Sequence, residues 1–360
     1  MTIAISGTNG ITLDGQFNSA SSMGFKNRII NGAMVIDQRN AGASVTVTTG
    51  VDYVVDRFFA QGSITSKFTA QQSSTVPTGF KNSLIFTSSA ATTPSASDYY
   101  YFSQIIEGLN VSDLAWGTAS AATVTLSFWV RSSLTGTFSG AVLNSATDRT
   151  YAFTYTINSA NTFEQKTVTI AGDTSGTWLT DNGNGMYVRF ALGAGSTFLQ
   201  TAGSWGTGNV VGATGTTQWI STSGATFYIT GVQLEKGSTA TSFDYRPYGT
   251  ELALCQRYYY LMASGNTLAI GIGTYTNSGT FFTYASFPVS MRTAPALVAT
   301  SGTSYYTTDA GDLFNSFTIT KAHTNGAAIY NNTEMSGTSL SSNPVYTNNA
   351  SASIAFNSEL

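Results

Sequence analysis

The chain has 360 residues, of which 42% are hydrophobic, 13% aromatic and only 9% charged, with a formal net charge of -3 at pH 7. This length can form two or three domains with cores of their own, and the apolar content argues against a disordered chain. Because no strongly basic surface is available, we expect neither nucleic acid nor an anionic membrane as a partner.

The first 24 residues show only a brief alternation of apolar and small residues. Ile3 and Ile5, then Ile11 and Leu13, predict two short strands that are too small to enclose a core. We interpret residues 1–24 as an attachment segment that joins the protein to a particle or to sister chains through these four side chains; a frayed terminus is the alternative. The segment lacks the features of a secretory signal, and no apolar run in the chain is long enough to span a bilayer.

The long middle part of the chain, residues 25–247, indicates an antiparallel β-sandwich. Short apolar or alternating runs recur there between clusters of Gly, Ser, Asn and Asp, without an amphipathic helical period. The cleanest alternation, from Val124 to Val130, places four apolar side chains on one face, and we expect Val188 and Phe190 opposite them. The pattern predicts a jelly roll. The expected strands are residues 45–48, 57–60, 67–71, 83–87, 99–106, 123–131, 150–157, 164–170, 186–192, 218–221 and 227–234.

A connector is expected at residues 248–260. Glu251 is well placed for the first turn of a helix, but three consecutive tyrosines favour a strand, so residues 251–261 are predicted as a brief helix or, preferably, a strand. The single cysteine, Cys255, lies in an apolar run, and we expect it to be a buried structural thiol. It cannot form a disulfide within the chain.

Residues 261–360 predict a second, smaller β-sandwich, so that the whole chain is expected to be all-β. Three prolines punctuate it and should lie at edges or turns. The loops at 301–314 and 331–350 are rich in Ser, Thr and Asn, and binding would be placed there. The expected strands are residues 267–272, 280–286, 296–300, 316–321, 326–330 and 352–356.

Three segments carry a resemblance to a known family. They are FKNRIINGAM at residues 25–34 with DQR at 37–39; GVQLEKG, FDYRP and LCQRYYY between residues 231 and 260; and AFNSEL at 355–360. The series resembles tail-fibre and related appendage proteins of tailed bacteriophages, in which a jelly roll similar to carbohydrate-binding modules precedes a C-terminal β domain. The resemblance covers residues 25–360, although only these segments are distinctive.

This resemblance implies a homotrimeric virion fibre. Its N-terminal strands would attach to other phage tail or capsid proteins, and its C-terminal domain would bind a glycan or protein on the host surface. The protein would act in the virion and outside the cell after host lysis, without a cofactor. The alternatives are a capsid decoration protein or head fibre, and an appendage enzyme that degrades glycans.

The sequence offers little for catalysis. One histidine, His323, excludes most catalytic triads and histidine zinc sites. Asp173 and Asp181, with Asn182 or Asn184, are candidate oxygen ligands for a structural calcium ion, although the spacing matches no defined loop. Pairs of carboxylates leave a glycosidase open, but we expect most of them to fix loops, and Asp244 with Arg246 to fix the exit of the jelly roll. The pairs are Asp52 with Asp56, Asp98 with Glu107, Asp173 with Asp181, and Asp309 with Asp312.

Glycan binding is supported by the types of residue present. Sugars offer apolar faces and hydroxyl edges, so their sites combine aromatic rings with Asn, Asp and Ser. Trp129 and Trp219 lie within predicted strands and are expected in the core, and His323 is expected in a turn. Phe281, Phe282, Tyr284 and Phe287 are candidates to line a threefold axis. The candidate ligand residues are Trp178, Trp205, Tyr305, Tyr306, Asp309, His323, Tyr330, Asn331 and Asn332.

Overall fold

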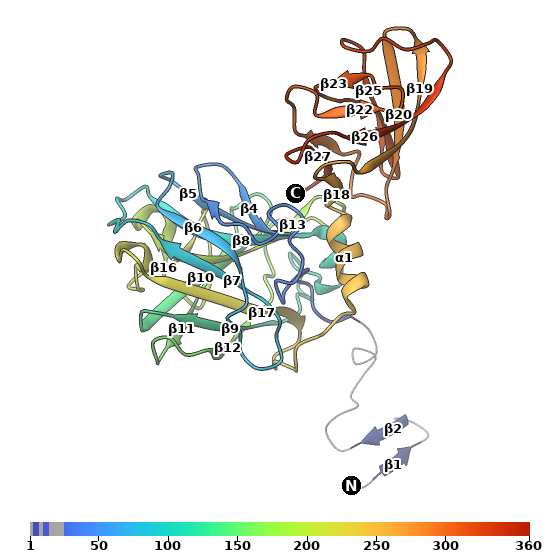
Figure 1. Cartoon of the computed structure of the whole chain (residues 1–360). Helices are drawn as coiled ribbons and strands as arrows, with labels where there is room; N and C mark the ends of the chain where they lie inside the picture. Colours follow the sequence, from blue (N-terminus) through green and yellow to red (C-terminus); the bar gives the residue numbers. More distant parts are fainter. Residues whose placement is uncertain (1–2, 7–9, 14–24) are drawn as a thin grey trace. The chain divides into compact units, whose positions relative to one another are not determined.

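The computed structural model describes residues 3–6, 10–13 and 25–360, and these residues form an almost entirely β structure (Figure 1). This confirms the predicted all-β class. The chain divides into two compact units. Unit 1 comprises Met1–Val35, Thr46–Gly50 and Gln61–Pro247, and unit 2 comprises Ile36–Val45, Val51–Ala60 and Tyr248–Leu360. Two early segments therefore belong with the residues after Pro247, and the domain limits drawn from the sequence remain predictions.

The N-terminal residues include a short hairpin. Strand β1 (Ile3–Ser6) pairs antiparallel with β2 (Gly10–Leu13), so that Ile3 lies opposite Leu13 and Ile5 opposite Ile11. The two predicted strands are confirmed. The rest of the predicted attachment segment lies outside the described residues, and its attachment role stays a prediction.

Unit 1 is built on two antiparallel sheets. Neighbouring strands run β15-β11-β10-β13-β8 in one sheet and β12-β9-β17-β7-β6 in the other. Four single 3-10 turns lie at Gly108–Asn110, Ser112–Leu114, Ser196–Phe198 and Trp219–Ser221. The strands are β3 (Val45–Thr46), β6 (Phe68–Ser73), β7 (Ser83–Ser88), β8 (Tyr99–Glu107), β9 (Val124–Ser132), β10 (Gly136–Leu143), β11 (Thr150–Ile157), β12 (Glu164–Ile170), β13 (Asn184–Ala194), β14 (Leu199–Gln200), β15 (Trp205–Gly206), β16 (Gly212–Ala213) and β17 (Thr226–Lys236).

The core of unit 1 lies between these sheets. The alternating residues of β9 from Val124 to Val130 are completely buried, as predicted. They face Val188 and Phe190 of β13, and the rings of Phe128 and Phe190 have centroids 5.1 Å apart. Phe102 of β8 continues the packing, stacked on Phe190 at 4.9 Å. Alternation thus predicts which side chains enclose the sandwich.

Two expectations for unit 1 are wrong, and one long strand was not predicted. Residues 218–221 form a 3-10 turn instead of a strand, although Trp219 is completely buried as expected. Trp129 is only half-buried, because it occupies an odd position in β9 and points to the outer side. Strand β10 escaped notice because its Gly- and Ser-rich sequence lacks a clear apolar alternation.

A hydrogen-bonded network joins the first and last parts of unit 1. The buried side chain of Asn27 donates to Val232 O at 3.0 Å and accepts from the backbone N–H groups of Ile29 and Leu234 at 2.9 and 3.0 Å. The Asp244 carboxylate accepts from the N–H groups of residues 26 and 27, and the Arg246 guanidinium donates to the carbonyls of residues 27 and 29. The prediction that Asp244 and Arg246 fix the exit of the jelly roll is confirmed.

The connector contains a helix. Helix α1 (Tyr248–Gln256) has Glu251 in its first turn, where a carboxylate favours the helix N-terminus. The preferred strand over residues 251–261 is therefore wrong for the first half, and β18 begins only at Tyr259. The Leu- and Ala-rich sequence before Cys255 has high helix propensity, which outweighs the tyrosines that follow it. Cys255 is completely buried, as expected.

Unit 2 contains two further antiparallel sheets, ordered β18-β27-β21 and β23-β22-β26-β19-β20-β25-β24, which confirms the second sandwich. The loops expected at 301–314 and 331–350 in fact include three strands, because short polar strands give little apolar signal. Early in the chain, β4 pairs with β5. The strands are β4 (Asp52–Val55), β5 (Phe58–Gly62), β18 (Tyr259–Ser264), β19 (Ala269–Asn277), β20 (Thr280–Ser286), β21 (Ala296–Ala299), β22 (Tyr306–Thr308), β23 (Leu313–Phe314), β24 (Thr318–His323), β25 (Gly326–Asn331), β26 (Ser342–Thr347) and β27 (Ser353–Asn357).

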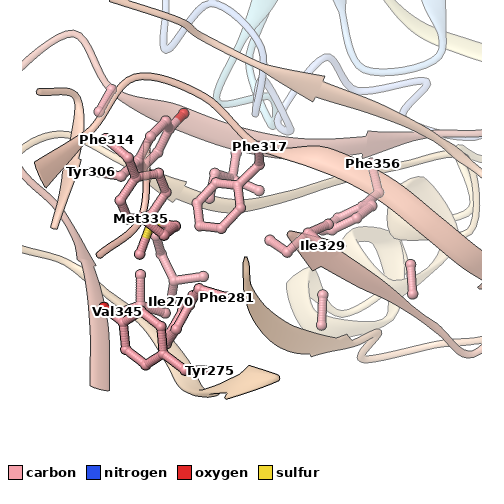
Figure 2. Packing of buried hydrophobic residues seen from close by; sticks show 14 of the residues in the cluster. Ile270, Tyr275, Phe281, Tyr306, Phe314, Phe317, Ile329, Met335, Val345 and Phe356 are labelled. Carbon is pink, nitrogen blue, oxygen red and sulfur yellow. The ribbon is translucent and has the colours of Figure 1, made fainter. Parts of the chain in front are cut away.

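Aromatic side chains dominate the core of unit 2. Figure 2 shows Tyr306, Phe314 and Phe317 gathered at one part of this core, with ring centroids 4.8 to 5.6 Å apart. Phe281 packs edge-on against Tyr275 at 4.9 Å and is completely buried. Phe281 therefore has no surface with which to line a threefold axis.

Unit 2 also encloses a cluster of charged side chains. Arg57 is 2% exposed, forms an ion pair with the Glu359 carboxylate, and lies 3.5 Å from the centroid of the Tyr258 ring. Arg39 pairs with the same carboxylate at 3.1 Å and lies over the Tyr259 ring. All of these residues except Arg57 belong to the distinctive DQR, YYY and NSEL segments, which are far apart in the sequence. The cluster therefore gives those segments a structural role.

Asp56 lies in the same cluster. Burial raises the pKa of Asp56 to about 6, although hydrogen bonds from Gln38 and the charge of Arg39 act in the opposite direction. Since the folded carboxyl releases its proton at a higher pH than an unfolded one, ionisation of Asp56 opposes folding. Its contribution to the stability of unit 2 is greatest at acidic pH and is lost as the pH rises from about 4 to about 6.

Candidate functional site

The larger sheet of unit 2 has one face packed on the core and one face turned to solvent. In β20 the residues at odd numbers from Phe281 to Ala285 are buried, whereas Phe282 and Tyr284 point outward. We call the solvent side the outer face. It comprises Ile272, Thr274, Phe282, Tyr284, Thr318, Thr320, His323, Ala328, Tyr330, Ser342 and Pro344.

Strand register aligns the outer face in a row across four strands. Thr274 of β19 lies opposite Phe282, Phe282 lies opposite Tyr330 of β25, and Tyr330 lies opposite Thr318 of β24. The rings of Phe282 and Tyr330 stack with centroids 5.0 Å apart and planes 20° from parallel. Two rings flanked by threonine hydroxyls therefore form one continuous strip.

Tyr284 and His323 form a second aromatic pair on the outer face. The Tyr284 hydroxyl lies 2.7 Å from His323 Nε2, and His323 Nδ1 accepts from the N–H of Asn325 at 3.2 Å. Because Nδ1 of the neutral imidazole is an acceptor here, the ring proton is on Nε2 and is donated to the Tyr284 oxygen. The Tyr284 O–H remains available to donate to a ligand.

The outer face is apolar and rich in hydroxyls. Ile272 is 73% exposed and Tyr284 52% exposed, which is unusual for large side chains on a regular strand. None of its eleven residues is Asp, Glu, Lys or Arg. Such a surface suits a partner that offers apolar patches and hydroxyl groups and carries little charge.

The structure brings together some of the predicted ligand residues of unit 2. His323 and Tyr330 share the outer face, and His323 ends β24 directly before a turn instead of lying in it. Asn331 is buried, with its amide nitrogen donating to Ser316 O. Tyr306 is completely buried, so it has no surface to offer a ligand.

Other candidates in unit 2 lie elsewhere. Tyr305 packs against the core, Asp309 and Asn332 are exposed, and Phe287 is half-buried beside Phe356 at 4.7 Å. Of the proposed axis residues, only Phe282 and Tyr284 point outward. Ile272, Thr274 and Pro344 were not identified from the sequence. These residues join the outer face only through the register of β19 with β20 and β26, which the sequence does not reveal.

Trp205 and Trp178 belong to an aromatic cluster in unit 1. Their ring centroids are 5.6 Å apart, and Trp116 packs against both, at 5.3 Å from Trp205 and 4.7 Å from Trp178. Tyr151 packs on Trp205 at 5.3 Å. The Trp205 indole N–H donates to Ala171 O at 2.8 Å. Trp178 is buried and Trp205 half-buried, and a small pocket beside the cluster is lined by Trp116, Trp178, Leu114 and Met186 among others. Their mutual contacts give both tryptophans a packing role.

The candidate carboxylates mostly fix loops. Asp98 accepts from Ser63 and from Ser95 N–H, which lowers the pKa of Asp98, and Asp312 accepts from Tyr275 and Ser336. Asp173 holds Arg149 through both of its oxygens. Among residues 25–360, no group of three or more His, Cys, Asp or Glu side chains is arranged to hold a metal ion. A calcium ion at Asp173 and Asp181 stays an untested prediction.

Comparisons with known proteins give weak likenesses. No family model matches the chain, and no curated protein matches it. Among solved structures, tailspike protein 4 of bacteriophage CBA120 matches at 14% identity and a TM-score of 0.31, covering 59% of this chain and 21% of the tailspike chain. A family 11 carbohydrate-binding module of a Clostridium thermocellum cellulase matches at 14% identity and a TM-score of 0.27, covering 56% and 99%. A C. thermocellum xylanase 10B fragment matches at 13% identity and a TM-score of 0.29, covering 62% and 33%.

These matches do not establish a relationship, and this chain spans only about a fifth of the tailspike chain. We therefore base the functional proposal on the residues of the chain itself. Within the part of the chain that the structure describes, no helix has the length and apolar character needed to cross a membrane.

Proposed function

We propose that the protein is a non-catalytic attachment protein that binds a neutral glycan on the outer face of unit 2. The observation that carries this proposal is the alignment of Phe282 and Tyr330 in one stacked row, with Tyr284 and His323 beside them on the same face. Aromatic rings pack on the apolar faces of sugars, while threonine hydroxyls and the Tyr284 O–H supply hydrogen bonds to their edges. The lack of charged side chains on this face favours an uncharged ligand.

Replacing Phe282 and Tyr284 together with serine is expected to lower glycan affinity by about a hundredfold. Each aromatic contact contributes about 1 kcal/mol beyond its buried area, so two contacts account for about thirtyfold at about 1.4 kcal/mol per factor of ten, and the lost burial of apolar surface supplies the rest. The measurement is isothermal titration of the full chain with neutral oligosaccharides selected on a glycan array. Because both side chains point to solvent, the double variant should fold normally.

Tyr248→Ser is the matched control, because Tyr248 is 63% exposed but lies on α1, away from the outer face. This variant should bind the same oligosaccharide as strongly as the wild type. The proposal is wrong if the wild type retains no neutral glycan on the array, or if the double variant binds as well as Tyr248→Ser.

We further propose that the chain acts as a homotrimeric fibre on a phage particle. Support comes from the resemblance of its three distinctive segments to tail-fibre and appendage proteins. Three copies would raise the avidity of a weak outer face through effective concentration. Light scattering after size exclusion should then give three times the chain mass of 37.9 kDa. A monomer at micromolar concentration would contradict the trimer without contradicting glycan binding by a single chain.

We propose binding without catalysis because the candidate carboxylates already have structural partners. Asp98, Asp173 and Asp312 are each engaged by neighbouring side chains or backbone N–H groups. We place the protein on the tail, because the resemblance is to tail-fibre and related appendage proteins. The alternative, a capsid fibre, would bind its ligand through the same outer face.

A further inference from the structure

Arg189 is a buried cation on the other unit of the chain. It belongs to β13 and is only 5% exposed. One terminal nitrogen, Nη1, donates to Asn209 Oδ1 at 2.6 Å and to Val210 O at 3.1 Å. The guanidinium carbon lies 4.9 Å from the ring centroids of both Tyr101 and Tyr187, so the cation sits between two aromatic rings.

The opposite edge of this guanidinium has no partner in the described residues. Nε is buried without a hydrogen bond, and Nη2 makes none. The ionisable groups that interact with Arg189 are the tyrosines Tyr99, Tyr101 and Tyr187, and no carboxylate is among them. Burial lowers the pKa of Arg189, although the charge remains at any physiological pH.

Two other arginines of the chain have a carboxylate as their partner. In Arg149, the Nε and Nη2 edge holds the Asp173 carboxylate through two parallel bonds of 2.8 and 2.7 Å. Arg57, which is as deeply buried as Arg189, pairs with Glu359 through Nη1. Arg189 has the same Nε and Nη2 edge as Arg149 and is as buried as Arg57. No acidic side chain of the described residues pairs with it.

A buried cation without a counter-ion is costly, and the two ring contacts offset only part of that cost. The Nε and Nη2 edge matches a carboxylate in its geometry, because the two donors are parallel and coplanar. Tyr99 and Tyr187 are half-buried and keep ring surface at the molecular surface, and Asn209 is exposed beside them. An acidic sugar can place its apolar face on the tyrosine rings and its carboxylate on the arginine edge.

We propose that Arg189 is the centre of a second binding site, on the outer side of the β8 and β13 strands of unit 1, for a sugar that bears a carboxylate. The half-buried rings of Tyr99 and Tyr187 turn aside to open the Nε and Nη2 edge, the carboxylate pairs with that edge, and the sugar ring packs beside the two tyrosines. This site does not depend on the neutral-glycan face of unit 2. Its failure would leave that proposal unaffected.

The test is isothermal titration of the full chain with tri-galacturonic acid, its methyl ester and the neutral galactose trimer. The acid is expected to bind about tenfold or more tightly than either uncharged form, with an affinity that falls as sodium chloride is raised. Arg189→Met should remove this preference. Arg189→Lys should remove most of it, because lysine keeps the charge and loses the planar fork.

Arg131→Met is the matched control. Arg131 also lies over a tyrosine ring in unit 1, 4.7 Å from the centroid of Tyr228, but it is on β9. This variant should bind the acid as the wild type does. Equal binding of acid and methyl ester by the wild type would overturn the proposal even if Arg189→Met failed to fold. Displacement of the acid by an equal concentration of acetate would also overturn it, because the site would then take any small carboxylate.

Discussion

Replacing Glu359 with alanine is expected to lower the free energy of unfolding of unit 2 by about 3–5 kcal/mol. The substitution leaves Arg57, which is 2% exposed, without the carboxylate that neutralises it, and it also removes the partner of Arg39. An uncompensated buried charge is among the most destabilising changes a single substitution can make. Hydrogen exchange read by mass spectrometry in peptides from β18 and β27 measures the loss within unit 2 itself.

The contrasting variant is Asp113→Ala. The exposed Asp113 pairs with Arg28 at 2.8 Å at the surface of unit 1, and exposed pairs of this kind contribute about 1 kcal/mol or less. A third variant, Glu359→Gln, keeps the shape of the side chain and removes its charge, so it should fall between the two. If Glu359→Ala costs no more than Asp113→Ala, the buried cluster does not stabilise unit 2.

Replacing Asn27 with alanine is expected to destabilise unit 1 by about 3 kcal/mol or more. The Asn27 side chain satisfies three backbone groups at once, the carbonyl of Val232 and the N–H groups of Ile29 and Leu234. Each buried group left without a partner costs about 1–3 kcal/mol. Tryptophan fluorescence during urea unfolding is a direct measurement, because all five tryptophans lie between Gln61 and Pro247 in unit 1.

Asn27→Asp separates hydrogen bonding from side-chain volume. It keeps the oxygen that accepts from Ile29 and Leu234, but the ionised carboxylate places a buried charge against Val232 O. Its loss should therefore be smaller than that of the alanine variant only at acidic pH, where the protonated carboxyl can donate to Val232 O. Asn158→Ala is the surface control, since the exposed Asn158 contacts only the loop around Glu164. An Asn27→Ala protein with the same urea midpoint as Asn158→Ala would contradict the role assigned to this side chain.

Local pattern was sufficient to predict the sheets of both units. The alternation of β9 predicted the buried face from Val124 to Val130, because a period of two leaves little freedom once one face must be apolar. Short strands such as β22 and β26 were not predicted. Each has one large buried residue and one buried threonine, so no apolar alternation is visible in the sequence. Helix α1 was predicted only as the less favoured alternative to a strand, because helix propensity and the tyrosine-rich sequence gave opposite signals within a few residues.

The candidate sites were harder to predict, because they depend on register and on long-range contacts. Tyr330 and His323 were candidates from their residue types alone, but their neighbours Phe282 and Tyr284 reach them only through the pairing of β20 with β25 and of β25 with β24. Tyr306 had the same composition signal and is a core residue. Arg189 gave no signal in the sequence, since nothing local shows that a cation will be buried without an acid nearby.

The pairing of Arg57 with Glu359 joins residues 302 positions apart in the chain. During synthesis, the arginine must therefore wait for 302 further residues before its counter-charge exists. Contacts of such long sequence separation slow folding and leave apolar and charged surface open in the meantime. The ribosome-bound chain would thus carry the first segments of unit 2 in an unfinished state, and chaperones or sister chains would have time to engage them before the cluster closes.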